Sequence, residues 1–149
     1  MTQWYPELTV AAIVERDGRF LLVEEEIEGE ALFNQPAGHL EQGESLPQAV
    51  VRETLEETGW EVEPQAICGF YLYASPRRGT TILRTAFIAR ALRHHAERPL
   101  DHGILRSCWM TRAELLATGR ARSPFVLRCM DDYLAGQRQP LDLITHISV

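Results

Sequence analysis

Three glutamates gather in the short stretch from Arg52 to Gly59. Glu53, Glu56 and Glu57 stand at positions i, i+3 and i+4, so a helix would place their carboxylates on one stripe. Each carboxylate pair repels by roughly 3 kcal/mol at ~5.5 Å and an effective dielectric constant of ~20. Two of the acids also fall in the last turn, where the helix dipole disfavours negative charge. A divalent cation bound through oxygen would relieve both penalties, so the stripe predicts a metal site.

The residues around this stripe indicate a helix with defined ends. Ser45 is the expected N-cap, and Gln48 three residues later completes a capping-box pattern. Gly59 stands where a left-handed glycine ends many helices, and Trp60 supplies the apolar contact beyond it. The sequence therefore predicts a helix from about Leu46 to Thr58. The residues expected on its buried side are Val50, Val51, Thr54, Leu55 and Thr58.

The stretch from Gly38 to Trp60 resembles the box of the Nudix hydrolases, G-x5-E-x7-R-E-U-x-E-E-x-G-U, in which U is a bulky apolar residue. Every fixed position is filled at the spacing of the pattern, by Gly38, Glu44, Arg52, Glu53, Glu56, Glu57 and Gly59. Thr54 departs from the first U position, and Trp60 meets the second. The departure weakens a packing contact and touches no expected ligand.

The resemblance to Nudix hydrolases implies an α/β fold, an α/β/α sandwich with a mixed sheet and a loop-helix-loop catalytic box. It also implies Mg²⁺ or Mn²⁺ as the cofactor and hydrolysis of a diphosphate linkage. The metal ligands that it implies are the Gly38 carbonyl, Glu53, Glu56 and Glu57. By the same resemblance Arg52 orients the acids, and Glu44 supports the loop or a water molecule beside the metal.

Short strings outside the box resemble one bacterial phosphatase of the family. They are ALFNQPAGHLE from Ala31 to Glu41, the pair Ser123-Pro124 and the segment from Gly136 to Leu141. They imply release of orthophosphate from nucleoside di- and triphosphates, or from a pyrimidine diphosphate that is a precursor of thiamine. Two alternatives remain open. One is a hydrolase of another nucleoside diphosphate derivative, such as ADP-ribose or a damaged nucleotide; the other is a ligand sensor with the Nudix fold and no catalysis.

Four residues are candidates for binding the substrate. Phe33 and Asn34 lie just upstream of Gly38, Arg84 lies inside an expected strand, and Trp109 ends another. An arginine can pair with a phosphate, and an aromatic ring can stack on a base. Turn arginines 77 and 78 are expected to be solvated. The histidines show no ligand spacing, and His39 is interpreted as a loop residue.

The whole chain, residues 1–149, is expected to form one Nudix hydrolase domain. An Asp17-Gly18 turn predicts an antiparallel hairpin between residues 8–15 and 19–23. Further strands are expected at 31–37, 66–74, 81–92 and 105–110. Thr111 and Ser123 are expected to cap two helices, and the second carries an apolar stripe, Val126, Cys129, Met130 and Tyr133. The acidic run 24–30 is interpreted as a charged strand end and loop rather than a second metal site. The tail, residues 141–149, gives no clear prediction.

Composition bounds the possible partners. The net charge of −6 argues against binding a nucleic-acid polymer through a basic face, while a small phosphorylated ligand stays compatible. The N-terminus does not resemble a signal peptide, and no apolar run reaches membrane-spanning length. Three cysteines without a CxxC pair are expected to be reduced thiols. The expectation is a cytoplasmic enzyme without a membrane partner, as a monomer or a small homo-oligomer.

Overall fold

The computed structural model describes residues 3–148, so Val149 at the end of the tail lies outside the described residues. Within this range the chain forms eight strands, three α-helices and one 3-10 helix, η1. In chain order they are β1 Glu7–Ile13, β2 Glu15–Arg16, β3 Arg19–Ile27, β4 Glu30–Asn34, β5 Ala37–His39, α1 Leu46–Thr58, β6 Trp60–Ser75, β7 Thr80–His94, β8 Ile104–Met110, α2 Arg112–Thr118, α3 Pro124–Leu134 and η1 Leu141–Leu143. None of these helices is long and apolar enough to cross a membrane.

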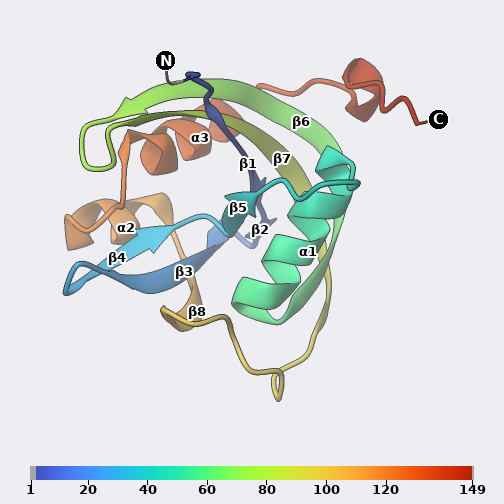
Figure 1. Ribbon diagram of the computed structural model, residues 1–149. Helices are drawn as coiled ribbons and strands as arrows, with labels where there is room; N and C mark the ends of the chain where they lie inside the picture. The colour runs from blue at the N-terminus through green and yellow to red at the C-terminus, as the bar shows by residue number, and fades with distance from the viewer. Residues whose placement is uncertain (1–2, 149) are drawn as a thin grey trace.

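The strands form one mixed sheet and one antiparallel sheet. The mixed sheet has the order β5-β1-β7-β6, with β1 parallel to β7 and the other neighbours antiparallel. In the second sheet β3 pairs with β2, β4 and β8. Figure 1 shows β6 and β7 as a long curved hairpin that arches over the molecule. Register shifts between Glu61 and Gly69 of β6 accompany this curvature.

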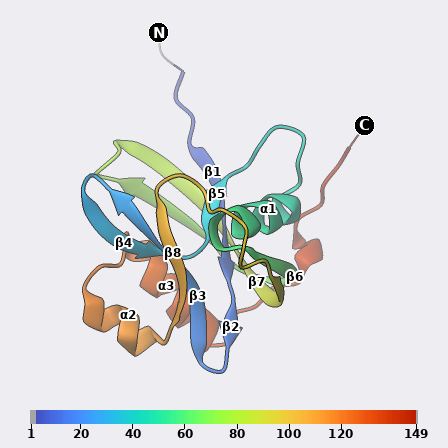
Figure 2. The same ribbon diagram turned by 90° about the horizontal axis from the view of Figure 1, so that it is seen from below.

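Helices cover both faces of the mixed sheet. Ala86 and Ile88 of β7 pack with apolar side chains of α2 and α3, whereas Phe87 and Ala89 pack with those of α1. Alternate residues of a strand point to opposite faces of the sheet. When both faces are covered, the sequence of the strand is therefore continuously apolar. In Figures 1 and 2, α1 lies on one side of β1 and α3 on the other. The architecture is the expected α/β/α sandwich.

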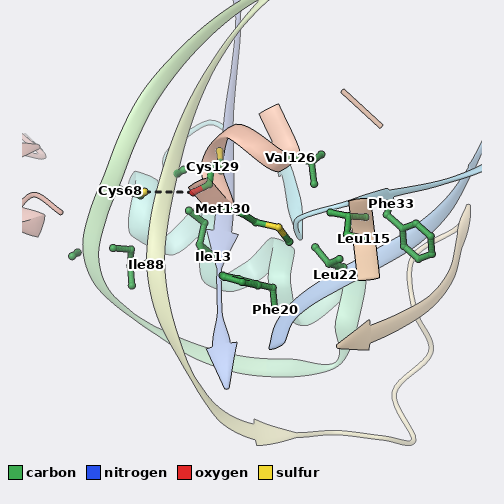
Figure 3. Packing of buried hydrophobic residues seen from close by; sticks show 12 residues of the cluster. Ile13, Phe20, Leu22, Phe33, Cys68, Ile88, Leu115, Val126, Cys129 and Met130 are labelled. Carbon is green, nitrogen blue, oxygen red and sulfur yellow. Dashed lines mark hydrogen bonds between the residues drawn. The ribbon is translucent and has the colours of Figure 1, made fainter. Parts of the chain in front are cut away.

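The apolar stripe of α3 is a core element, as the sequence predicts. Val126, Cys129 and Met130 are fully buried, and Tyr133 is partly buried with its ring edge on Phe20 at a centroid distance of 5.6 Å. Figure 3 shows these first three side chains in the same buried cluster as Phe20. The stripe fixes α3 against the sheet, and the beginning of α3 therefore reaches the site described below.

The hairpin predicted at Asp17-Gly18 exists, but it is much shorter than expected. Only two residue pairs join its arms, Glu15 with Phe20 and Arg16 with Arg19. The prediction was wrong for β1, because both edges of β1 are taken by β5 and β7. The chain leaves the mixed sheet after Ile13 and enters the second sheet with β2.

Three smaller differences concern the residues that lead into the helices. The strand predicted over 31–37 is two strands, β4 and β5, separated by Pro36, which has no N–H for a ladder hydrogen bond. His39 belongs to β5 and pairs with Thr9, so it is not a loop residue. Ser123 stands at the N-cap of α3, but its side chain makes no capping hydrogen bond. The capping box at Thr111 is present as predicted.

Candidate active site

Helix α1 begins and ends where the sequence predicts. The Ser45 hydroxyl accepts a hydrogen bond from the Gln48 N–H at 3.2 Å, and the Gln48 side chain accepts one from the Ser45 N–H at 2.8 Å. Gly59 has a φ of 77° and donates to the Leu55 carbonyl at 2.9 Å. All residues of this helix are described, and none in its last turn is basic. The last turn itself therefore supplies no counter-charge to Glu56 and Glu57.

Two acids of α1 converge with a third from outside the box. Single carboxylate oxygens of Glu53, Glu56 and Asp101 all lie within 4.8 Å of one another. The loop between β7 and β8 brings Asp101 there, because the Asp101 N–H donates to the Glu56 carbonyl at 3.1 Å. One hard divalent cation could contact all three oxygens. Sequence analysis missed Asp101, since a single acid in a loop carries no spacing signal.

Strand β5 lies directly against Glu53. A Cβ added to Gly38 would lie 2.1 Å from the carboxyl carbon of Glu53, so no larger residue fits while Glu53 stays in place. Here glycine is required by close approach, because the carboxylate rests on bare backbone. The structure thus brings Gly38 and Glu53 together, as the resemblance implies.

Glu57 is held beneath the same strand and is mostly shielded from water. Its carboxylate accepts a hydrogen bond from the Ala37 N–H at 2.9 Å. Burial raises the pKa of Glu57 to about 8, and the charges of Glu25, Glu53 and Asp101 add to the effect of burial. Without a cation, Glu57 therefore keeps its proton at neutral pH. The clustered carboxylates carry more negative charge than the nearby cationic side chains neutralise. Such a set of oxygen donors fits a hard divalent metal.

Arg52 binds several of the acids at once. Its guanidinium donates to both carboxylate oxygens of Glu44, at 2.9 and 2.6 Å, and to Glu53 at 2.8 Å. It also contacts Glu56 at 3.3 Å and the His39 carbonyl at 3.0 Å. Even so, the pKa of Glu53 is raised, mainly by burial. Arg52 therefore orients the carboxylates and, through Glu44 and the His39 carbonyl, connects α1 to the segment that precedes it. It does not neutralise the carboxylates.

A cavity of about 700 Å³ opens beside the acids. Residues of β1, β5 and β7 line it together with the β6–β7 turn and the start of α3. One end carries Gly38, Glu53 and Glu57, and the remainder carries aromatic, apolar and arginine side chains. The lining residues of that second part include Asn34, Tyr73, Arg77, Arg78, Ile82, Arg84, Arg122, Pro124 and Phe125.

The structure brings two of the four substrate-binding candidates to the cavity. Asn34 and Arg84 line it, but Phe33 and Trp109 do not. Phe33 is fully buried in the core, because consecutive strand residues point to opposite faces and Asn34 takes the cavity side. Trp109 packs edge-on against Trp60, with ring centroids 5.6 Å apart. Sequence analysis missed the aromatic walls, Tyr73 and Phe125.

Arg84 is buried, although a strand arginine is usually exposed. It is only 4% exposed, and it donates to the Asn34 side-chain oxygen at 3.0 Å and to the Gln35 side-chain oxygen at 2.9 Å. The Phe125 ring centroid lies 4.6 Å from the centre of the guanidinium. Burial lowers the pKa of Arg84.

The acidic run 24–30, which spans the end of β3 and the turn into β4, forms ion pairs with arginines. Arg77 lies 3.6 Å from Glu28 and 3.4 Å from Glu30, and Arg106 and Arg120 both contact Glu24 at 2.8 Å. In residues 3–148 this run forms no cluster with metal-ligand spacing. Its interpretation as a charged strand end and loop fits these contacts.

One family model and several known proteins match most of the chain. The NUDIX domain model matches residues 6–128. Phosphatase NudJ of Escherichia coli is 40% identical over 139 residues, which cover 93% of this chain and 90% of that protein. A NUDIX hydrolase structure from Nitrosomonas europaea is 43% identical with a TM-score of 0.93, covering 96% of this chain and 98% of that one. The solution structure of the E. coli ORF135 protein is 26% identical with a TM-score of 0.69, covering 89% and 91%.

Each of these similarities spans most of the chain, and the acids of the box stand together beside a cavity that can admit a small ligand. The sensor alternative is thereby set aside, because the relatives are a phosphatase and hydrolases. The chain belongs to the Nudix family, and it is a hydrolase that cleaves diphosphate bonds in small phosphorylated substrates.

Proposed function

We propose that the protein uses Mg²⁺ or Mn²⁺ to release orthophosphate from nucleoside di- and triphosphates or from a pyrimidine diphosphate. The observation that carries this proposal is the cluster of Glu53, Glu56 and Asp101, whose carboxylate oxygens lie within 4.8 Å of one another and whose member Glu53 lines the cavity. The similarity to Phosphatase NudJ favours removal of a terminal phosphate over other cleavages. The reaction takes place in the cytoplasm, where the three free cysteines would stay reduced.

The donor set determines the kind of cation. Glu53, Glu56, Glu57, Asp101 and the Gly38 carbonyl offer oxygen only, which suits Mg²⁺ or Mn²⁺ rather than zinc or copper. The cation, when bound, neutralises diphosphate charge, polarises the phosphorus and lowers the pKa of the attacking water.

The other residues hold these donors in place. Arg52 fixes the directions of the Glu53 and Glu56 carboxylates through contacts of 2.8 and 3.3 Å. The Ala37 N–H fixes Glu57 at 2.9 Å. Because these contacts come from backbone and from a guanidinium that stays charged, the donor geometry is set before substrate arrives.

Product analysis tests the proposal. A nucleoside diphosphate with Mg²⁺ should yield the monophosphate and orthophosphate, and excess chelator should stop the reaction. Glu56→Gln should lower turnover by at least about 100-fold, whereas Glu63→Gln, on the exposed part of β6, should not change it. Efficient cleavage of ADP-ribose to AMP and a sugar phosphate, with inert nucleoside diphosphates, would reject the proposed substrate class. Full turnover in chelator would reject the metal.

A further inference from the structure

Four arginines line the cavity, and Arg84 is the one whose charge has no carboxylate partner among residues 3–148. The other three are Arg77, Arg78 and Arg122, which pair with Glu28, Glu7 and Glu25 at 3.6, 2.8 and 2.6 Å. Arg84 is also the most buried of the four, at 4% exposure. Burying a cation against neutral partners is costly. Because the Arg84 guanidinium stands at the cavity wall without a carboxylate partner among the described residues, its charge is available to bind a ligand.

Neutral amides hold the guanidinium in a fixed orientation. The Gln35 side-chain nitrogen donates to the Val126 carbonyl at 2.8 Å, which turns its oxygen toward Arg84. Asn34 supplies the second oxygen. A guanidinium has five N–H donors, and these two amides together with a weak 3.9 Å contact to the Cys129 sulfur do not use all of them.

Arg84 and the acids belong to different elements around one cavity. In the mixed sheet Thr9 pairs with His39 of β5 on one side and with Arg84 of β7 on the other. The backbone of Arg84 is therefore two strand spacings, about 10 Å, from the residue next to Gly38. A substrate whose diphosphate lies at the acids can present its organic part to Arg84, because Glu53, Glu57 and Arg84 line the same cavity.

The walls around Arg84 are flat and apolar. Phe125 lies over the guanidinium, and the Tyr73 ring meets Phe125 edge-on with centroids 5.2 Å apart. Ile82 and Pro124 complete this part of the lining. Such walls suit a heteroaromatic ring better than a hydrated phosphate or a sugar.

We propose that Arg84 recognises the acceptor edge of a heteroaromatic base, through carbonyl oxygen or ring nitrogen atoms, while the diphosphate lies at the acids. Arginine is the side chain that most often reads such acceptor atoms on bases. Arg84 is thus a specificity-determining residue for the base, rather than a phosphate ligand. The inference rests on the proposed function, because it takes the diphosphate to be cleaved at the acids.

Turnover of substrates with and without a base provides the first test. Arg84→Met should lower kcat/KM for cytidine and guanosine diphosphates about 10- to 100-fold, mainly through KM. Turnover of inorganic pyrophosphate, which has no base, should change by less than about twofold. Arg90→Met is the matched control, since Arg90 lies exposed on the same strand and should leave both substrates unaffected. An equal loss on pyrophosphate would place Arg84 at the phosphates and overturn the proposal, as would no loss on either substrate.

A binding measurement on the wild-type protein does not depend on the variant folding or on catalysis. In chelator, calorimetry should give cytidine or guanosine monophosphate at least about tenfold tighter binding than ribose 5-phosphate, which keeps the phosphate and lacks the base. Equal affinities would overturn the base subsite. Tighter binding of the monophosphates by a protein that hydrolyses no nucleoside diphosphate would reject the proposed function and keep the subsite.

Discussion

Glu57 allows a direct test of the excess negative charge in the acid cluster. Glu57→Gln keeps a side-chain oxygen for the Ala37 N–H, which lies 2.9 Å away, and removes the charge. In the metal-free protein the folded state holds a proton on Glu57 up to a pH of about 8, whereas the unfolded chain releases it near 4.5. The unfolded state therefore binds fewer protons between these values, and wild-type stability falls as the pH rises from 4.5 to 8.

The pKa values set the size of the effect. A rise from 4.5 to about 8 corresponds to an upper limit of roughly 5 kcal/mol, at 1.36 kcal/mol per unit. Water entry and side-chain relaxation reduce this limit, so we expect wild type to lose about 2–4 kcal/mol between pH 5 and pH 9 through Glu57. The Gln variant has no such charge to bury. Its stability should therefore exceed that of wild type at pH 9 and approach it at pH 5.

Urea unfolding in excess chelator at pH 5, 7 and 9 measures this difference. Glu63→Gln serves as the control, because its carboxylate is exposed on β6, and its curve should run parallel to that of wild type. Adding Mg²⁺ at 100 times its Kd should stabilise wild type by about 2.7 kcal/mol and the Gln variant by less. Parallel pH curves for Glu57→Gln and wild type would refute the reasoning, since the buried charge would then cost nothing.

Three further changes test the surroundings of the acids. Gly38→Ala should weaken Mg²⁺ binding at least about tenfold in calorimetry, because its Cβ would displace the Glu53 carboxylate that lies 2.1 Å from that position. Asp101→Asn should weaken Mg²⁺ binding by about 1–2 kcal/mol but leave stability in chelator unchanged or higher, since a like charge beside Glu53 is lost. Unchanged Mg²⁺ affinity in either variant would contradict its placement at the metal. Thr54→Val should lie within about 1 kcal/mol of wild type in urea unfolding, because the Thr54 hydroxyl has one hydrogen-bond partner among residues 3–148, the Val50 carbonyl at 2.7 Å.

The parts of the fold set by local chemistry could be predicted from the sequence. Helix α1 carries its own caps, so both of its ends follow from Ser45, Gln48 and Gly59. Its acids fall on one stripe by helical geometry alone. The turn at Asp17-Gly18 was also predictable, but the partner of β1 was not. β1 pairs with residues more than 70 positions away, and no turn signal encodes that pairing.

The features of the site that depend on tertiary placement could be predicted only in part. Asp101 reaches the acids through a backbone hydrogen bond to Glu56, and its neighbours in sequence give no sign of it. Arg84 was a candidate from the sequence, but its burial could not be predicted, because it requires Phe125 of α3 to cover the guanidinium. Phe33 and Asn34 were both plausible, and only the direction of the β4 pleat separates them.

The division of the molecule by its mixed sheet has a consequence for how such proteins diverge. The acids stand on α1 and the loop after β7, while Phe125 and the side chains around it belong to α3 and the opposite side of the sheet. Sites that share no contacts tend to contribute additively. Exchanging residues at the start of α3 would then alter which molecule is selected and leave the hydrolytic apparatus intact. Substitutions confined to α3 can therefore give such a protein a new substrate specificity.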